Sequence, residues 1–132
     1  MSEPLLSVAD LTIAFRGAAR PAVDGASFSL DRGRTLGVVG ESGSGKSTVA
    51  LALLRLLPPA ARIRSGTIRF DGGDIHTASE RTLATIRGRR MAMIFQEPTA
   101  ALDPVMTVSD QVAEPFVIHD QRSWKDEIGR AH

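Results

Sequence analysis

The chain has 132 residues, of which 42% are hydrophobic and 23% are charged, so it is long enough to bury a core and too apolar for a disordered chain. Sixteen basic and fifteen acidic residues leave a net charge of +1, which excludes a strongly basic nucleic-acid-binding protein. The absence of cysteine excludes disulfides, thiolate catalysis and cysteine-based zinc sites. The longest apolar run, residues 49–54, is far shorter than the roughly 20 residues of a membrane-spanning helix.

The first half of the chain combines predicted strands with one helix. Alternating apolar and polar residues predict strands over residues 5–15 and 23–30. A short apolar strand over residues 35–39 leads into a glycine-rich loop. A helix is predicted from Lys46 to Leu57, where two prolines follow. The middle of this helix is apolar on nearly every side, which predicts that it is buried.

The second half begins with shorter predicted elements. An alternating strand spans residues 67–71. Thr77, with Glu80 three positions later, has the capping-box pattern of a helix that runs to about Gly88. A five-residue apolar strand over residues 91–95 then precedes a loop that contains two prolines.

Two further helices are predicted towards the end of the sequence. Thr107 and Asp110 can cap the first of them, which Pro115 is expected to interrupt. Ser123 and Asp126 can cap the second, which has only begun where the sequence stops.

A phosphate-binding loop is the strongest chemical signal. The pattern G-x-x-x-x-G-K-[ST] lies between a predicted strand and a predicted helix. Its residues are Gly40, Glu41, Ser42, Gly43, Ser44, Gly45, Lys46, Ser47 and Thr48. Glycines let successive backbone N–H groups point at one phosphate, and the following helix aims its positive end at the same place.

Three side chains of this loop have expected roles. Lys46 can reach the β- and γ-phosphates of a nucleotide as a mobile positive charge. The Ser47 hydroxyl can coordinate Mg²⁺, which prefers oxygen ligands, and Thr48 can contact the α-phosphate. A nucleotide site alone does not choose among kinases, GTPases and motor ATPases.

The sequence around the loop distinguishes among these classes of nucleotide-binding protein. Four stretches stand in a characteristic order: AVDGASF at 22–28, the phosphate loop at 40–48, SGTIRFDG at 65–72, and IFQEP at 94–98 continuing as LDPVMT at 102–107. Together they resemble the ATPase subunit of ATP-binding cassette (ABC) transporters, and most closely the importer branch for di- and oligopeptides and nickel. The resemblance implies ATP and Mg²⁺ as ligands. It also implies an α/β P-loop NTPase fold, with a RecA-like core and an N-terminal antiparallel β-subdomain.

The resemblance also implies that an aromatic ring about 25 residues before the phosphate loop stacks on adenine. Phe15 stands at that distance, at the end of a predicted strand. Stacking needs only a π face and contributes on the order of 1 kcal/mol. The alternative, a strand phenylalanine that packs in the core, stays open.

Two interpretations are also open for residues 91–103. As a Walker B strand, this segment would have Gln96 in place of the usual Asp, and Glu97 as the catalytic base. As a Q-loop, it would use the Gln96 carbonyl oxygen for Mg²⁺ or its water, and the Gln96 amide to sense the γ-phosphate. Only about 50 residues separate Lys46 from Gln96, and the family's Walker B strand lies much further along. We therefore favour the Q-loop, with Lys46 and Gln96 as catalytic residues and Ser47 and Gln96 as Mg²⁺ ligands.

The segment after Gln96 has a second implied task. In the family, this loop and the helical subdomain receive a short helix of the membrane permease. Four apolar residues can present a surface for it: Met106, Val108, Val112 and Phe116. Their packing inside the helical subdomain is at least as good an explanation.

Several family parts do not occur in the 132 residues, namely the signature Leu-Ser-Gly-Gly-Gln, a Walker B strand ending in Asp-Glu, and the switch histidine. We therefore expect a fold truncated inside the helical subdomain. Residues 1–97 would form the N-terminal part of the ATP-binding core, and residues 98–132 the start of the helical subdomain. Without the water-polarising carboxylate, hydrolysis by these residues alone is expected to fail.

The sequence thus predicts an ABC importer ATPase that couples ATP binding and hydrolysis to uptake of a solute, with a peptide favoured. Its expected partners are a second ABC ATPase subunit and the permease, with no nucleic acid. Its expected location is the cytoplasmic, inner face of the membrane, reached through the permease. The alternative is a truncated nucleotide-binding module that holds ATP without turnover. A small-molecule kinase is less favoured, because the β-rich first 35 residues precede the phosphate loop.

Overall fold

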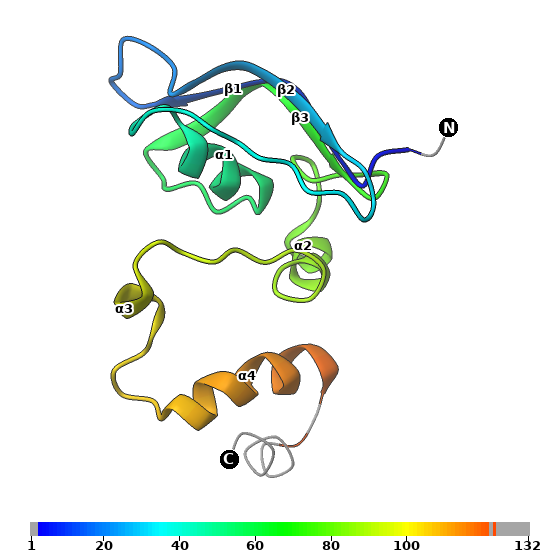
Figure 1. Cartoon of the computed structure of the whole chain (residues 1–132), viewed down its shortest axis with the longest axis vertical. Coiled ribbons are helices and arrows are strands. Elements are labelled where there is room, and N and C mark those ends of the chain that lie inside the picture. Colours follow the sequence, from blue (N-terminus) through cyan, green and yellow to red (C-terminus); the bar gives the residue numbers. More distant parts are fainter. Residues whose placement is uncertain (1–2, 122, 124–132) are drawn as a thin grey trace. The chain divides into compact units, whose positions relative to one another are not determined.

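The computed structural model describes residues 3–121 and residue 123 (Figure 1). The chain divides into two compact units, Met1–Leu83 and Ala84–His132, which we call the first and second unit and describe separately. The helix predicted from Ser123 onwards lies outside the described residues.

The first unit is built on a four-stranded antiparallel sheet of order β2-β1-β3-β4. Its strands are β1 (Leu6–Phe15), β2 (Val23–Leu30), β3 (Ala61–Phe70) and the short β4 (Gly73–Asp74). Figure 1 shows the three long strands side by side. The two strands predicted first in the chain and the antiparallel N-terminal sheet are confirmed.

A bulge interrupts β1 where its alternation slips. Asp10 has φ of 50°, and the register jumps from Ala9 opposite Thr67 to Thr12 opposite Ser65. Because one extra residue changes the parity of a strand, Leu6 and Val8 before the bulge and Leu11 and Ile13 after it are all buried.

The same bulge explains why β3 begins at Ala61 rather than at residue 67. Ser65-Gly66 has the sequence of a turn, yet Gly66 lies inside the strand with φ of +94°. A Cβ on Gly66 would lie 2.5 Å from the Asp10 carbonyl oxygen. Glycine here therefore permits the close approach of two strands, not a reversal of the chain.

The core of the first unit comes mainly from the sheet. Leu11, Ile13, Ile68 and Ile75 are at most 1% exposed. Helix α1 (Lys46–Leu53) is shorter than predicted, and Ala52 is its one buried residue. The prediction of a fully buried helix is therefore wrong, since most of its side chains are half-buried.

The early end of α1 has a local cause. Arg55 adopts φ of 53°, the Arg55 N–H donates to the Ala52 carbonyl, and the Leu56 N–H donates to the Leu51 carbonyl. This pattern of a left-handed residue with a long back-reaching bond is the Schellman motif, which ends a helix before the prolines are reached.

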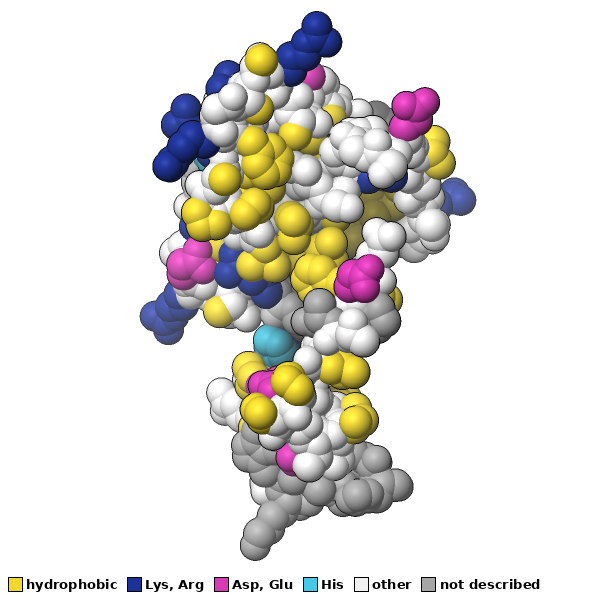
Figure 2. Space-filling view, turned by 90° about the vertical axis from the view of Figure 1, so that its left-hand side faces the viewer, with side chains coloured by type: hydrophobic (Ala, Val, Ile, Leu, Met, Phe, Trp, Pro, Cys, Tyr) yellow, Lys and Arg dark blue, Asp and Glu magenta, His cyan; other side chains and the backbone are white. Residues whose placement is uncertain are grey.

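Two segments predicted as strands do not form strands in the structure. Val39 is 93% exposed in the segment over residues 35–39, and Ile94 is 99% exposed in the segment over residues 91–95. Within the described residues neither segment is hydrogen-bonded into the sheet, and the strand-like pairing of Met91 is limited to an isolated bridge with Arg87. An apolar segment becomes a strand only when a neighbour takes up its N–H and C=O groups. Figure 2 shows hydrophobic side chains gathered on the face that is turned to the viewer.

Helix α2 (Glu80–Ile86) is capped by Ser79 and not by the predicted Thr77. The Thr82 N–H donates to the Ser79 hydroxyl at 3.1 Å. The Thr77 N–H instead donates to the Asp74 carboxylate, also at 3.1 Å, in a turn after β4. The helix therefore begins two residues later than its capping-box pattern suggests.

The second unit contains the short α3 (Pro98–Ala101) and the longer α4 (Val108–Asp120). Thr107 caps α4 as predicted, because its side chain accepts a hydrogen bond from the Asp110 N–H. Pro115 lies within α4 and does not interrupt it. Its ring is exposed, so water can hydrate the carbonyl that lacks a donor. Among the described residues, no helix is both long and apolar enough to cross a membrane.

Candidate nucleotide-binding site

The phosphate loop ends at the first residue of α1. Gly45 is the N-cap, with φ of 91° and no side-chain cap, and the first helical bond joins the Val49 N–H to the Gly45 carbonyl at 2.9 Å. The N–H groups of Lys46, Ser47 and Thr48 therefore have no acceptor within the helix. These donors lie at the positive end of the helix dipole, where an anion is stabilised.

The loop curls around its own lysine. Lys46 Nζ donates to the carbonyl oxygens of Gly40 and Glu41, each at 2.7 Å, and to the Ser44 hydroxyl at 3.2 Å. The ammonium group is thus held against the first residues of the loop. Its acceptors are neutral oxygens, which a phosphate oxygen can replace with a stronger, charge-assisted bond.

The three glycines of the loop are required for different reasons. A Cβ on Gly40 would lie 2.6 Å from the Ser44 hydroxyl. A Cβ on Gly45 would lie 2.5 Å from the Ala22 carbonyl oxygen, in addition to a positive φ. Gly43 has φ of +81° with open space around it. The backbone therefore forms a tight cradle in which a side chain at Gly40 would collide with Ser44, and one at Gly45 with Ala22.

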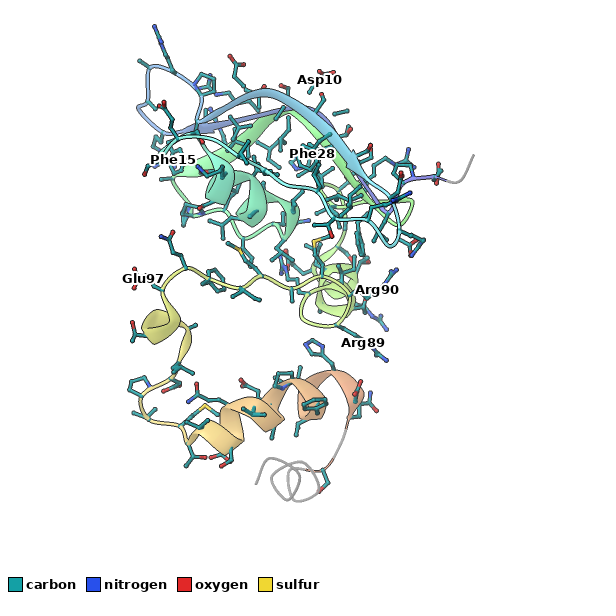
Figure 3. The ribbon with its side chains drawn as sticks, in the orientation of Figure 1. Asp10, Phe15, Phe28, Arg89, Arg90 and Glu97 are labelled. Carbon is teal, nitrogen blue, oxygen red and sulfur yellow. The ribbon has the colours of Figure 1, made fainter. Side chains whose placement is uncertain are left out.

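The sheet fixes the position of this cradle through Ala22. The Ala22 N–H donates to the Ile13 carbonyl at 2.8 Å, and the Ala22 carbonyl lies against Gly45. Phe15, labelled in Figure 3, ends β1 two residues after Ile13. The structure thus brings the phosphate loop and Phe15 to the same end of the β1–β2 hairpin.

A cavity of about 180 Å³ adjoins Phe15. Its lining combines an aromatic residue, three arginines and small residues: Ala14, Phe15, Arg16, Gly17, Pro59, Ala60, Arg62 and Arg64. The Phe15 side chain is half-buried, so the ring is neither enclosed in the core nor fully in solvent. The role of Phe15 in stacking on adenine stays a prediction.

Gln96 belongs to the second unit. It is exposed, and it lies in a bend just before α3, whose N-cap is Glu97. Figure 3 labels Glu97 at this point of the chain. The choice of the Q-loop for Gln96, and its contact with nucleotide or Mg²⁺, stay predictions.

The apolar residues after Gln96 divide between two environments. Met106 is half-buried, whereas Val108, Val112 and Phe116 are 69%, 52% and 44% exposed. These last three are spaced four residues apart and therefore form one stripe along α4. Ala113 is the buried residue of the helix.

One polar residue of this region escaped the sequence analysis. The Gln111 amide donates to the carbonyl oxygens of Asp103 and Met106, and its oxygen accepts from the Asp103 N–H. A glutamine in the first turn of a capped helix, after a proline-containing loop, is only a weak signal for such a contact. Three-dimensional structure was needed to find it.

The profile of the ABC transporter family matches residues 23–131, which is most of the chain. The chain belongs to the ABC transporter family. This ABC transporter chain is 50% identical over 121 residues to the peptidoglycan transport ATP-binding protein YejF of Agrobacterium fabrum, covering 89% of the chain and 22% of that protein.

Two further ABC transporter relatives show similar agreement. The oligopeptide transport ATP-binding protein OppD of Bacillus subtilis is 42% identical over 122 residues, covering 90% of the chain and 34% of that protein. The probable peptide ABC transporter ATP-binding protein y4tR of Sinorhizobium fredii is 43% identical over 130 residues, covering 96% and 39%. The chain therefore spans between 22% and 39% of the length of these three relatives.

Proposed function

We propose that the chain is the ATP-binding subunit of an ABC importer that couples ATP binding and hydrolysis to uptake of a peptide through a membrane permease. The phosphate loop, with its lysine among backbone carbonyls and its helix N-terminus, carries the nucleotide part of this proposal. The peptide part is supported by the names of the relatives, which are peptidoglycan, oligopeptide and peptide transport proteins.

The residues present suit a nucleoside triphosphate with Mg²⁺. Gly40 and Gly45 let the loop approach Ser44 and Ala22 closely, where a Cβ would collide, and backbone N–H groups of residues 40–48 can donate to phosphate oxygens. Lys46 exchanges its neutral acceptors for the β- and γ-phosphates. When bound, Mg²⁺ would neutralise phosphate charge, with Ser47 and Gln96 as its protein ligands.

Phe15 supplies the base contact in this proposal. Phe15 is the last residue of β1, and Ala22, which bonds to Ile13 of the same strand, lies against Gly45 of the phosphate loop. An adenine joined to phosphates in the loop would therefore lie within reach of Phe15. The guanidinium groups beside it make the surroundings favourable for an anionic ligand.

The 132 residues by themselves are proposed to bind ATP without turnover. They contain neither the sequence Leu-Ser-Gly-Gly-Gln nor an apolar strand ending in Asp-Glu, so no residue is assigned to polarise the attacking water. A nucleotide-binding module without hydrolysis is accordingly the second candidate function.

The proposed partners follow from the family. A second ABC ATPase subunit would face the phosphate loop, and the permease would contact the segment after Gln96, where Val108, Val112 and Phe116 are exposed. The subunit would then lie at the cytoplasmic face of the membrane through its permease.

The test is titration calorimetry of the purified 132-residue chain with Mg-ATP, together with an assay of phosphate release. We expect binding by the wild-type chain, loss of binding in Lys46→Ala, and unchanged binding in Arg69→Ala, which removes one exposed positive charge from the end of β3. Equal binding by the Lys46→Ala and wild-type chains would contradict the phosphate site. Phosphate release that Lys46→Ala abolishes would contradict binding without turnover.

A further inference from the structure

The amide of Gln111 joins α4 to the loop that precedes it. Gln111 Nε2 donates to the Asp103 carbonyl at 3.0 Å and to the Met106 carbonyl at 3.1 Å. Gln111 Oε1 accepts from the Asp103 N–H at 2.9 Å. The oxygen and the nitrogen of the Gln111 amide therefore both form hydrogen bonds, and Gln111 binds both the backbone N–H and the backbone carbonyl of Asp103.

Asp103 continues the network within the loop. Its carboxylate accepts from the Val105 N–H at 2.9 Å, and its carbonyl also accepts from the Met106 N–H at 3.3 Å. Thr107 then caps α4 through the Asp110 N–H at 3.2 Å. A continuous chain of polar contacts thus links Asp103 to the first turn of the helix.

Apolar packing does not hold this loop. Leu102 is 55% exposed and Val105 is 90% exposed, whereas Gln111 is half-buried. Since exposed side chains contribute little to holding a segment in place, the hydrogen bonds of Gln111 and Asp103 define its conformation.

We propose that Gln111 is a positioning residue that couples the segment after Gln96 to α4. The inference rests on the proposed function in one respect, that Gln96 contacts bound nucleotide. Gln96 and Asp103 are seven positions apart, and α3 occupies part of that distance. On this proposal, the bonds between Gln111 and Asp103 are the link through which a movement of Gln96 reaches α4.

Two variants of similar volume separate this role from packing. Gln111→Glu keeps an acceptor for the Asp103 N–H but sets a carboxylate oxygen against two carbonyl oxygens. Gln111→Met keeps the apolar stem and removes every hydrogen bond. Glu114→Ala, an exposed change on the same helix, is the matched control.

The measurement is peptide-resolved amide hydrogen exchange of the full 132-residue chain, with and without Mg-ATP. Without nucleotide, we expect about tenfold faster exchange over residues 103–106 in both Gln111 variants, because both lose the two Nε2 bonds that hold the loop to α4, and Gln111→Met also loses the acceptor of the Asp103 N–H. With nucleotide, we expect slower exchange over residues 40–48 in all variants. Slowing over residues 97–106 is expected only in the wild-type and Glu114→Ala chains.

Equal nucleotide-dependent slowing over residues 97–106 in the Gln111 variants and the wild-type chain would overturn the proposal. If Mg-ATP slows exchange in neither region of the wild-type chain, the proposed nucleotide function fails. The nucleotide-free comparison then decides for Gln111: wild-type exchange over residues 103–106 in both variants overturns its role, and tenfold faster exchange supports it.

Discussion

Strand β1 and the segment over residues 35–39 are both predicted as strands from their apolar residues, but only β1 pairs. β1 has β2 on one side and β3 on the other, and its Leu11 and Ile13 are fully buried. Val38 and Val39 in the second segment are 54% and 93% exposed. Apolar residues therefore indicate a possible strand, but a strand forms only where neighbouring strands can pair with it.

Removing a buried side chain from β1 gives the largest expected effect. Ile13→Ala is expected to lower the free energy of unfolding by about 2–5 kcal/mol, because Ile13 is fully buried and a cavity would remain. Urea unfolding followed by circular dichroism measures the change. A loss close to zero would mean that β1 does not form the core of the first unit.

A change in the phosphate loop tests how firmly that loop is held against the sheet. Gly43→Ala is expected to cost about 1–2 kcal/mol for its positive φ alone. Gly45→Ala is expected to cost more, since its Cβ would also meet the Ala22 carbonyl. Equal unfolding free energies for the two variants would argue against the contact between the loop and the hairpin.

A smaller effect is expected at the start of α4. Thr107→Ala removes the hydroxyl that accepts from the Asp110 N–H and is expected to destabilise the helix by about 1 kcal/mol. Thr107→Ser keeps an accepting hydroxyl and should preserve most of that stability. Amide exchange over the first turn of α4 measures both changes, and identical protection in the alanine and wild-type chains would contradict the cap.

The smallest effect is expected in the unpaired segment. Val39→Lys should change the free energy of unfolding by less than about 0.5 kcal/mol, because the side chain is already in solvent. The same urea measurement applies, with Ile13→Ala as the comparison. A loss as large as that of Ile13→Ala would show that residues 35–39 pack in a core and would remove the contrast with β1.

Some elements could be predicted because short-range chemistry decides them. The phosphate loop is recognisable from its glycines, lysine and serine, since each position meets a local requirement of backbone geometry or charge. The Thr107 cap and β2 were also predicted, the cap because one side chain meets one nearby N–H group, and the strand because alternation places every second residue on one face.

Other features depend on which of several possible partners a group meets, either nearby or far along the chain. The sequence favours Thr77 as a helix cap, yet Asp74 binds its N–H group and Ser79 takes the role. Ser65-Gly66 has the composition of a turn, but Gly66 pairs within β3 because β1 has a bulge opposite it. In both cases a contact absent from the local pattern competes with the expected one.

The sequence by itself determined the phosphate loop, strand β2 and the family resemblance, because these follow from residue type and spacing, and the resemblance in turn implied the N-terminal antiparallel sheet. Only the tertiary structure decided that β3 begins at Ala61, that residues 35–39 stay unpaired, and that Gln111 holds the loop before α4. The physical reason is that hydrogen-bonding groups need partners, and the fold, not the local sequence, decides which partners come within reach.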